Sequence, residues 1–357
     1  MRLPSRDLEE VTHRMAVDWE QLRGQQIFVT GGSGFIGRWI VESFWAANSA
    51  HRLRSRMFVL TRDPSSFADG APHIAADNAI TIIRGDLGNP GFKDSDFSDR
   101  CDFVIHAATA SSAELARGDS RKFAETIEGT RRVLDLAVAH GARRFLYLSS
   151  GAVYGPQPAS VPLLAEDFEG GSAPLDPGSQ YAQAKRAGEA LCSDYATREG
   201  LGTVIARGFA FIGPNLPLGG KFAAGSFLSD LLEGAPIRVH GDGTAVRSFL
   251  YAGDLAAWLW TLLLRGAPGR AYNVGSERAV SIGELAGETA SLARPPLRVE
   301  ISGTPDPSRP PERYVPSTAR AREELGLFET VNRLESLRRT FDWHRNAGDA
   351  AGLRVAG

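Results

Sequence analysis

The chain has 357 residues, of which 43% are hydrophobic and 23% are charged, the balance of an ordinary globular protein. Its length excludes a short peptide or a minimal binding module, and it allows one large core with a smaller lobe, or two domains. The 40 Lys and Arg residues nearly cancel the 42 Asp and Glu residues, so composition indicates neither nucleic acid nor a membrane surface as a partner.

Short β-rich apolar runs recur along the chain and alternate with segments of helical spacing, after a polar lead-in that reaches about Gly24. The runs cover residues 27–30, 57–60, 80–83, 103–106, 145–148, 203–206 and 271–274. Each is continuously apolar, which is typical of a strand buried on both faces of a parallel sheet. The alternation predicts an α/β fold, a Rossmann-type doubly wound parallel sheet with helices on both faces.

The predicted organisation has three parts. A lead-in at 1–24 precedes a dinucleotide-binding Rossmann domain at 25–207. This domain also includes a return strand near 271–274. From residue 208 onward the regular alternation of apolar runs and helical segments ends, and short segments separated by Gly and Pro follow. We therefore expect a smaller α+β substrate-binding lobe at 208–345. The most apolar stretch contains Asp254 and is shorter than the roughly 20 residues of a membrane span, so we expect a buried helix there.

The cysteines and the first residues bear on the cellular compartment. Cys101 and Cys192 lie far apart and outside any metal-ligand spacing, so neither a disulfide framework nor a metal site is indicated. A reducing cytosol fits this cysteine usage best. The first residues mix charges throughout and lack the apolar core of a secretory signal. We therefore expect a cytoplasmic protein.

A glycine-rich turn joins the first predicted strand to the first predicted helix. Its glycines, in the sequence TGGSGFIGR, allow a tight turn, close approach of a pyrophosphate to the backbone, and close packing of helix on strand. The helix N-terminus adds free N–H groups and the positive end of its dipole. A tight turn alone is the alternative, but the strand before it and the helix after it favour a dinucleotide site. The predicted cofactor-binding residues of the turn are Gly31, Ser33, Gly34, Phe35, Ile36 and Gly37.

The end of the second strand selects the dinucleotide. In VLTRDP, Thr61 stands where an acidic residue would bond the adenosine ribose of NAD, and Arg62 follows it. An arginine there favours the 2′-phosphate of NADP, so NADP is the expected cofactor. In the alternative, Arg62 is a solvated surface residue and Asp63 caps the next turn, which leaves NAD possible.

A serine, a tyrosine and a lysine form the predicted catalytic set. Tyr181 and Lys185 are four residues apart on a segment of good helix formers, so their side chains share one face. The lysine cation would stabilise the phenolate and bring its pKa from about 10 toward neutrality, where a tyrosine can act as acid or base. Ser150 ends the strand FLYLSS, where a sheet edge presents residues to a ligand. A surface Tyr/Lys pair is the alternative.

These motifs, with segments such as GDGTAVRSFLYAGDLA and SRPPERYVPSTARAREELGL, resemble an extended short-chain dehydrogenase of the NAD-dependent epimerase/dehydratase family, from about residue 25 to 341. The resemblance implies a nucleotide-linked sugar as substrate. It implies further cofactor contacts at Asp86, Leu87, Ala107 and Ala108, beside His106, to which we assign no chemistry. It implies that Arg247 and Arg309 bind the diphosphate, and that Lys221 and Phe222 lie in a loop that closes on the nucleotide.

Departures from the family pattern narrow the chemistry. Members that dehydrate a sugar carry an Asp-Glu pair directly after the catalytic hydroxyl residue, and this chain has Gly151 and Ala152 there. Neither can transfer a proton, so a dehydratase is disfavoured, and a decarboxylase for the same reason. Ala210 replaces the asparagine of the galactose epimerases. Two further departures are Thr126 for an asparagine and Ser248 for an aspartate.

The sequence therefore predicts an NAD(P)-dependent oxidoreductase of a nucleotide-linked sugar, with a 4-ketoreductase as the first hypothesis. A nucleotide-sugar 4-epimerase with tightly held NAD is the alternative. A more remote one is a non-catalytic dinucleotide-binding protein, because a fold does not determine a function. We also expect a homodimer, and no nucleic acid or membrane as partner.

Overall fold

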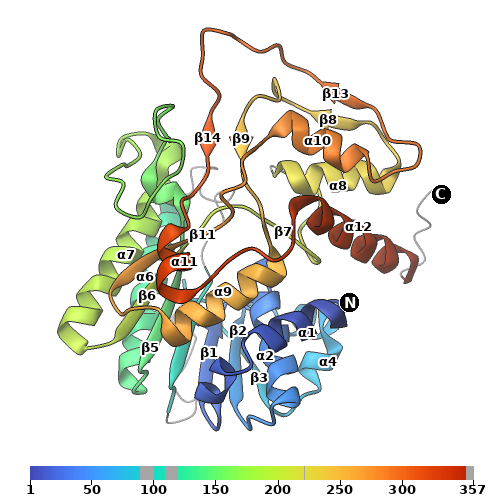
Figure 1. Ribbon diagram of the computed structural model, residues 1–357. Helices are drawn as coiled ribbons and strands as arrows, with labels where there is room; N and C mark the ends of the chain where they lie inside the picture. The colour runs from blue at the N-terminus through green and yellow to red at the C-terminus, as the bar shows by residue number, and fades with distance from the viewer. Residues whose placement is uncertain (89–99, 109–119, 221, 351–357) are drawn as a thin grey trace.

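The computed structural model describes residues 1–88, 100–108, 120–220 and 222–350. At its centre is a seven-stranded sheet in the order β11-β6-β5-β4-β1-β2-β3, in which every neighbouring pair is parallel (Figure 1). The strands are β1 (Gln26–Thr30), β2 (Arg56–Thr61), β3 (Ile80–Arg84), β4 (Phe103–His106), β5 (Arg144–Ser150), β6 (Gly202–Gly208) and β11 (Arg270–Val274). All seven predicted strands and the α/β fold class are confirmed.

The sheet is buried on both faces, as the continuously apolar runs predict. In β1, Ile27 and Val29 pack into one hydrophobic core, and Phe28 between them packs into the other. The strand order reverses between β1 and β4, which lie side by side. In open parallel sheets, ligands bind outside the carboxyl ends of the strands at such a reversal.

Helices cover both faces of the sheet (Figure 1). One face carries α1 (Ser5–Arg14), η1 (Asp18–Leu22), α2 (Phe35–Ala50) and α9 (Ala252–Arg265). The other carries α6 (Ser120–Ala139) and α7 (Gln180–Glu199). Shorter helices are η3 (Gly151–Tyr154), η4 (Pro177–Ser179), α11 (Ala319–Leu325), and α3 (Pro64–Gly70) and α4 (Pro72–Ala75), which contact β3.

The most apolar stretch of the chain forms α9, which the sequence predicts as a buried helix. Every residue from Ala252 to Leu264 is buried, and α9 packs between α1, α2 and the sheet. Among the residues that the structure describes, no helix combines the length and the apolar character needed to cross a membrane. The prediction of a buried helix is therefore confirmed.

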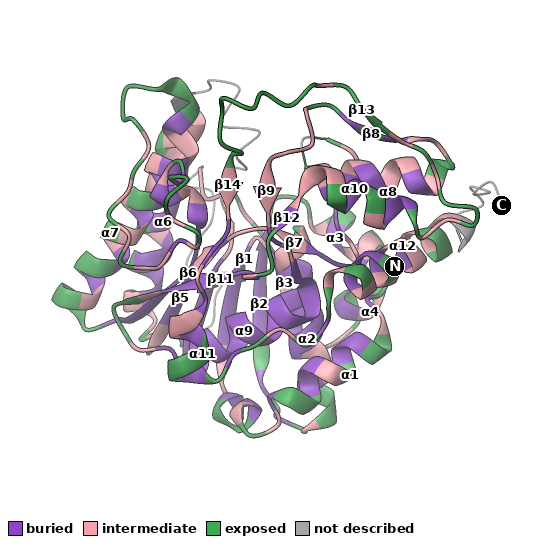
Figure 2. Cartoon of the chain, turned by 45° about the horizontal axis from the view of Figure 1, so that its top comes forward, coloured by how far each residue is buried: buried purple, intermediate pink, exposed green. Residues whose placement is uncertain are grey.

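A second lobe, with its own hydrophobic core, lies beyond one end of the sheet (Figure 1). Its helices are α8 (Ala223–Glu233), α10 (Ile282–Ala290) and α12 (Arg333–Ala350). Its short strands are β7 (Phe211–Ile212), β8 (Ile237–Val239), β9 (Val246–Arg247), β10 (Leu250–Tyr251), β12 (Val280–Ser281), β13 (Val299–Ile301) and β14 (Arg313–Tyr314). Figure 2 shows buried strands at the centre of the molecule and an exposed segment leading from β13 to β14. The division at residue 208 stays a prediction.

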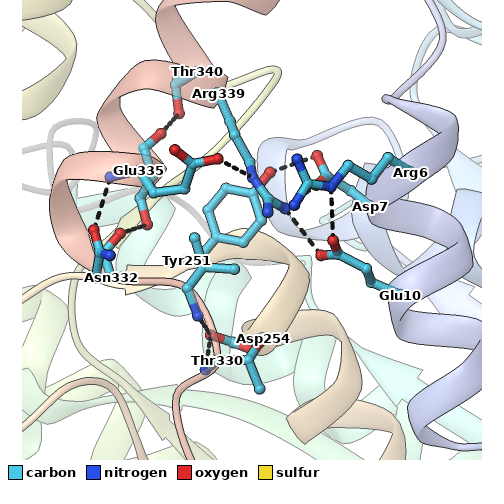
Figure 3. Close-up of polar contacts among 12 residues, drawn as sticks. Arg6, Asp7, Glu10, Tyr251, Asp254, Thr330, Asn332, Glu335, Arg339 and Thr340 are labelled. Carbon is cyan, nitrogen blue, oxygen red and sulfur yellow. Dashed lines mark hydrogen bonds and ion pairs between the residues drawn. The ribbon is translucent and has the colours of Figure 1, made fainter.

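The N-terminal lead-in packs into the main core. Trp19 of η1 is fully buried, and its ring meets that of Trp260 on α9 at 5.2 Å between centroids. Polar contacts also tie α1 to the second lobe, since Asp7 accepts a hydrogen bond from Tyr251 and pairs with Arg339 of α12 (Figure 3). The lead-in thus joins the sheet layer to the C-terminal helix.

Candidate active site

Two glycines of the predicted turn are required by close backbone contacts. Gly31, directly after β1, has a φ of +74°, and a Cβ built there would lie 2.7 Å from the Ala108 nitrogen. A Cβ on Gly37, in the first turn of α2, would lie 2.0 Å from the Gly31 carbonyl oxygen. The turn is therefore held tight against both its own helix and the end of β4. This geometry fits the close approach of a dinucleotide pyrophosphate to the backbone.

A cleft opens at this turn, at the carboxyl ends of the strands. It brings together predicted residues from four separate segments, namely Gly31, Ser33, Gly34, Thr61, Arg62, Asp86, Leu87, Ala107 and Ala108. The sequence did not predict the other lining residues, which are Leu60, Gly85, Gly88, Lys122, Glu125, Thr126 and Gly129. Four of these come from α6, which shows no local motif. The predicted residues Phe35, Ile36 and Gly37 lie in the first turn of α2, beside the cleft.

The end of β2 combines features of both dinucleotide hypotheses. Arg62 is exposed and lines the cleft, as expected for a residue that meets a 2′-phosphate. Asp63 is the N-cap of α3, where its carboxylate accepts hydrogen bonds from the Ser66 amide at 3.0 Å and the Ser65 hydroxyl at 2.6 Å. These bonds lower the pKa of Asp63. Its carboxylate is thus committed to the helix cap.

His106 is a neutral structural residue beside the cofactor cleft. Its ring nitrogens contact the hydroxyls of Thr30 at 2.7 Å and Thr130 at 3.1 Å, and Thr30 also accepts from the Ala108 amide. Burial lowers the pKa of His106 to about 3. This agrees with the sequence analysis, which assigned it no chemistry. In the described part of the chain, no group of three or more His, Cys, Asp or Glu side chains could hold a metal ion.

Ser150, Tyr181 and Lys185 come together at the carboxyl edge of the sheet. Ser150 ends β5, and the other two lie one turn apart at the start of α7. The Ser150 hydroxyl lies near the Tyr181 phenol. Lys185 Nζ donates to the Leu148 carbonyl over 2.6 Å and lies 5.8 Å from the centre of the Tyr181 ring. The arrangement can exchange a proton with a substrate oxygen placed against Ser150 and Tyr181.

Burial is the largest influence on the pKa values of Lys185 and Tyr181. It lowers the pKa of Lys185 to about 7, an effect that the negative charge of Glu189 opposes. It raises the pKa of Tyr181, which the nearby Ser150 hydroxyl lowers. The sequence analysis expected Lys185 to lower the pKa of Tyr181. In the folded chain burial is the larger effect, and it raises the pKa of Tyr181.

The sequence analysis did not identify a partly buried ion pair near the catalytic set. Glu189, one turn beyond Lys185, pairs with Arg207 of β6 through two contacts of 2.7 and 3.0 Å, and it accepts a 2.5 Å hydrogen bond from Ser149. The spacing of Tyr181, Lys185 and Glu189 puts all three on one helix face, so the glutamate had a sequence signal. Arg207 had none, because nothing local distinguishes it from a surface arginine.

The residues predicted to bind substrate lie in the second lobe. Arg247 on β9 pairs with Glu312 over 2.7 Å, and its partner across the strand pair is Tyr314. Arg309 is exposed in the segment before β14, and Phe222 is 60% exposed directly before α8. Lys221 lies outside the described residues. The substrate-binding roles of all four stay predictions.

Tyr314 of β14 reaches the catalytic set, which the sequence analysis did not anticipate. Its ring packs on that of Phe209 with 4.6 Å between centroids, and burial raises the pKa of its phenol. A Cβ on Gly151 would lie 2.7 Å from the Tyr314 hydroxyl and 2.6 Å from the Phe209 ring. The second lobe thus contributes a hydroxyl at the end of β5.

The parallel sheet, the glycine turn and the Ser-Tyr-Lys set define a protein of the short-chain dehydrogenase type. The family model described as NAD dependent epimerase/dehydratase family matches residues 27–275. This match covers more than half of the chain. The chain therefore belongs to the NAD-dependent epimerase/dehydratase family, as its motifs predict.

Characterised relatives align over nearly the whole chain. A dTDP-glucose 4,6-dehydratase of Streptomyces antibioticus is 27% identical over 331 residues, which are 90% of this chain and 92% of the relative. A UDP-glucuronic acid decarboxylase of Arabidopsis thaliana is 28% identical over 322 residues, 90% of this chain and 70% of the relative. Among solved structures, an epimerase of Methanothermobacter thermautotrophicus superposes with a TM-score of 0.79 at 23% identity, covering 94% of this chain and 96% of its own. The UDP-glucose 4-epimerase of Thermotoga maritima gives a TM-score of 0.76 at 22% identity, with coverages of 90% and 99%.

Proposed function

We propose that the chain is an NAD(P)-dependent oxidoreductase of a nucleotide-linked sugar, and that it reduces a 4-keto group. One observation carries the proposal: Ser150 ends β5 and lies with Tyr181 and Lys185 of α7 at the carboxyl edge of the sheet, while Gly151 and Ala152 stand where dehydratases carry an acidic pair. The sugar class is supported by the relatives, whose names specify dTDP-glucose and UDP-glucuronic acid. A dehydratase or decarboxylase reaction needs the acid and base that these two positions lack.

In the proposed mechanism, the side chains orient the substrate oxygen and move its proton. A bound nicotinamide would supply the hydride. Ser150 holds the carbonyl oxygen by its hydroxyl, and Tyr181 gives that oxygen a proton as it becomes a hydroxyl. Lys185, anchored on the Leu148 carbonyl, places positive charge beside the Tyr181 ring, which stabilises the phenolate left behind.

We propose NADPH rather than NADH as the reductant. Arg62 lines the cleft, whereas Asp63 is not among its lining residues and caps α3 through Oδ1. A guanidinium suits a phosphate well. NAD stays the alternative, since crystal structures of similar proteins, such as the UDP-glucuronic acid 4-epimerase of Bacillus cereus, contain NAD.

A 4-epimerase is the second candidate, favoured by the likeness of the fold to solved 4-epimerases. An epimerase regenerates its cofactor in every cycle, whereas a reductase must release the oxidised form. Ala210, in place of the epimerase asparagine, favours the reductase. We also propose a cytosolic homodimer, as expected from the sequence.

The two candidates differ in cofactor stoichiometry. We expect a protein that purifies largely free of dinucleotide and consumes one NADPH for each 4-keto nucleotide sugar, measured by loss of nicotinamide absorbance. Interconversion of two nucleotide hexoses without added cofactor, and without a net absorbance change, would show that the epimerase hypothesis is right.

A further inference from the structure

The amine of Lys185 lies deep inside the protein. The residue is only 2% exposed, and its Nζ donates a hydrogen bond to the Leu148 carbonyl over 2.6 Å. A charge that has lost its water is costly unless neighbouring groups stabilise it. The groups packed around Nζ therefore decide where the ammonium lies and how readily it keeps its charge.

The ring of Tyr147 faces this amine. Lys185 Nζ lies over the ring, 5.2 Å from its centre, which is within the roughly 6 Å at which an aromatic face attracts a cation. Tyr147 is fully buried and directly precedes Leu148 on β5, so two consecutive residues of one strand supply the ring and the carbonyl. A cation–π attraction is strongest where water is excluded, as it is at this position.

Two neighbours determine how the Tyr147 ring lies. His106, its partner across β4 and β5, stacks on the ring with 5.7 Å between centroids and 29° between the planes. Burial lowers the pKa of His106 to about 3, so this imidazole is neutral and adds no positive charge beside the ammonium. On α7, a Cβ at Gly188 would lie 2.2 Å from the Tyr147 hydroxyl. Gly188 follows Lys185 by three residues, so the same helix face carries the amine and leaves space for the ring.

We propose that Tyr147 is a positioning residue whose ring holds the Lys185 ammonium beside β5, in the place from which the lysine acts on Tyr181. The inference rests on the proposed function, in which Lys185 stabilises the Tyr181 phenolate, and it adds to that function a residue from the core beneath the site. It also assigns roles to His106, which orients the ring, and to Gly188, which makes room for it.

The proposal predicts how Tyr147 affects the charge of Lys185. An aromatic face stabilises the ammonium and not the neutral amine, so the ring raises the pKa of Lys185 and its removal lowers that pKa. In the unaltered protein, burial lowers the pKa of Lys185 to about 7. The other titratable groups that face the lysine are Tyr181, Glu189 and Cys192 on α7 and His106 on β4. Substitutions at Tyr147 leave all of these groups in the chain.

The test follows the lysines of the whole protein by NMR, with the carbon next to each amine labelled with ¹³C. The sequence contains only four lysines, Lys93, Lys122, Lys185 and Lys221, and the Lys185 signal is assigned from its loss in Lys185→Met. In Tyr147→Leu we expect the midpoint of the Lys185 titration to fall by about one pH unit, as the loss of a desolvated cation–π contact predicts. Tyr147→Phe keeps an aromatic face, so its midpoint should stay near the unaltered value.

Phe145→Leu is the matched control. Phe145 is fully buried in the same core, two residues before Tyr147 on β5, and its ring also meets that of His106, at 6.2 Å between centroids. It lies three residues from Leu148, whose carbonyl binds the amine. This variant therefore removes a ring from the same strand and core, and it should leave the Lys185 midpoint unchanged.

A second variant keeps the ring and moves it. Gly188→Ala should push the Tyr147 ring away from the ammonium and lower the Lys185 midpoint. Water entering the space left by Tyr147→Leu would hydrate the ammonium and raise the midpoint, so the sign of the change separates a lost ring contact from a loosened core. Tyr147→Leu decides the test where it folds, and Gly188→Ala decides it otherwise.

The outcomes are distinct. An unchanged or raised midpoint in the deciding variant, or an equal fall in Tyr147→Phe or Phe145→Leu, would overturn the proposal. The titration needs neither substrate nor dinucleotide. Its result is therefore independent of whether the chain reduces a 4-keto sugar, and a failed reductase assay would not change it.

Discussion

At the scale of single residues, the proton that accompanies the hydride depends on Tyr181. Its phenol lies near Ser150, and the centre of its ring lies 5.8 Å from Lys185 Nζ. Tyr181→Phe keeps the ring and removes the acid, so turnover should fall about 10²–10⁴-fold while dinucleotide binding stays near normal. Steady-state kinetics and dinucleotide titration check this together. Full activity in the variant would exclude Tyr181 as the acid.

Arg62 should decide which dinucleotide binds more tightly. It lines the cleft, and a charge-assisted bond to a 2′-phosphate contributes roughly 1.5–3 kcal/mol. We expect NADPH to bind more tightly than NADH, and Arg62→Ala to remove most of the difference.

Arg84→Ala is the matched control for this measurement. It removes an exposed arginine from the end of the neighbouring strand β3, outside the lining of the cleft, and should leave the preference intact. Fluorescence titration of the unaltered protein and the two variants with both nucleotides measures the six affinities. Equal affinities in the unaltered protein would favour NAD.

At the scale of elements, the lead-in behaves as part of the main core. The fully buried Trp19 packs on Trp260 and donates its indole N–H to the Thr12 carbonyl over 3.1 Å. Trp19→Ala should therefore lower the free energy of unfolding by about 3–5 kcal/mol through lost burial and the cavity that remains.

Val17 provides the contrast, because it precedes the same 3-10 helix but is 86% exposed. Val17→Ala should change the free energy of unfolding by less than about 0.5 kcal/mol. Denaturant unfolding of both variants makes the comparison. Similar midpoints would mean that the lead-in adds little to the stability of the core.

At the scale of the whole molecule, one partly buried arginine joins the two ends of the chain. Arg339 of α12 contacts Asp7 at 2.5 Å and Glu10 at 2.9 Å on α1, and Asp7 also accepts from Tyr251 of β10 (Figure 3). Asp7 is 2% exposed. Arg339→Ala removes the positive charge that faces the buried Asp7 carboxylate. We therefore expect it to lower the free energy of unfolding by about 3–5 kcal/mol.

A surface pair on the same helix is the control. Arg345 pairs with Asp342, and both side chains are nearly half exposed, so Arg345→Ala should cost less than about 1 kcal/mol. Chemical denaturation compares the two variants. Equal and small losses would show that the Asp7 cluster is not what holds the two ends together.

The strands, the glycine turn and the start of α7 could be predicted because each depends on a local pattern. Continuous apolar runs indicate doubly buried strands, and a four-residue spacing aligns Tyr181 with Lys185 whatever the rest of the chain does. The family and the fold class follow from these patterns. The same four-residue spacing could also have placed Glu189 on the helix face of Tyr181 and Lys185.

The tertiary structure alone decided which distant side chains meet. Nothing near Tyr314 in the sequence indicates that its hydroxyl lies beside Gly151, and nothing near Asp7 indicates that it pairs with Arg339. The sign of the pKa change at Tyr181 was also beyond the sequence, because it depends on how much water the folded chain excludes from the phenol. Spacing along one element is set by local backbone geometry, whereas burial and contacts between elements arise only when the whole chain packs.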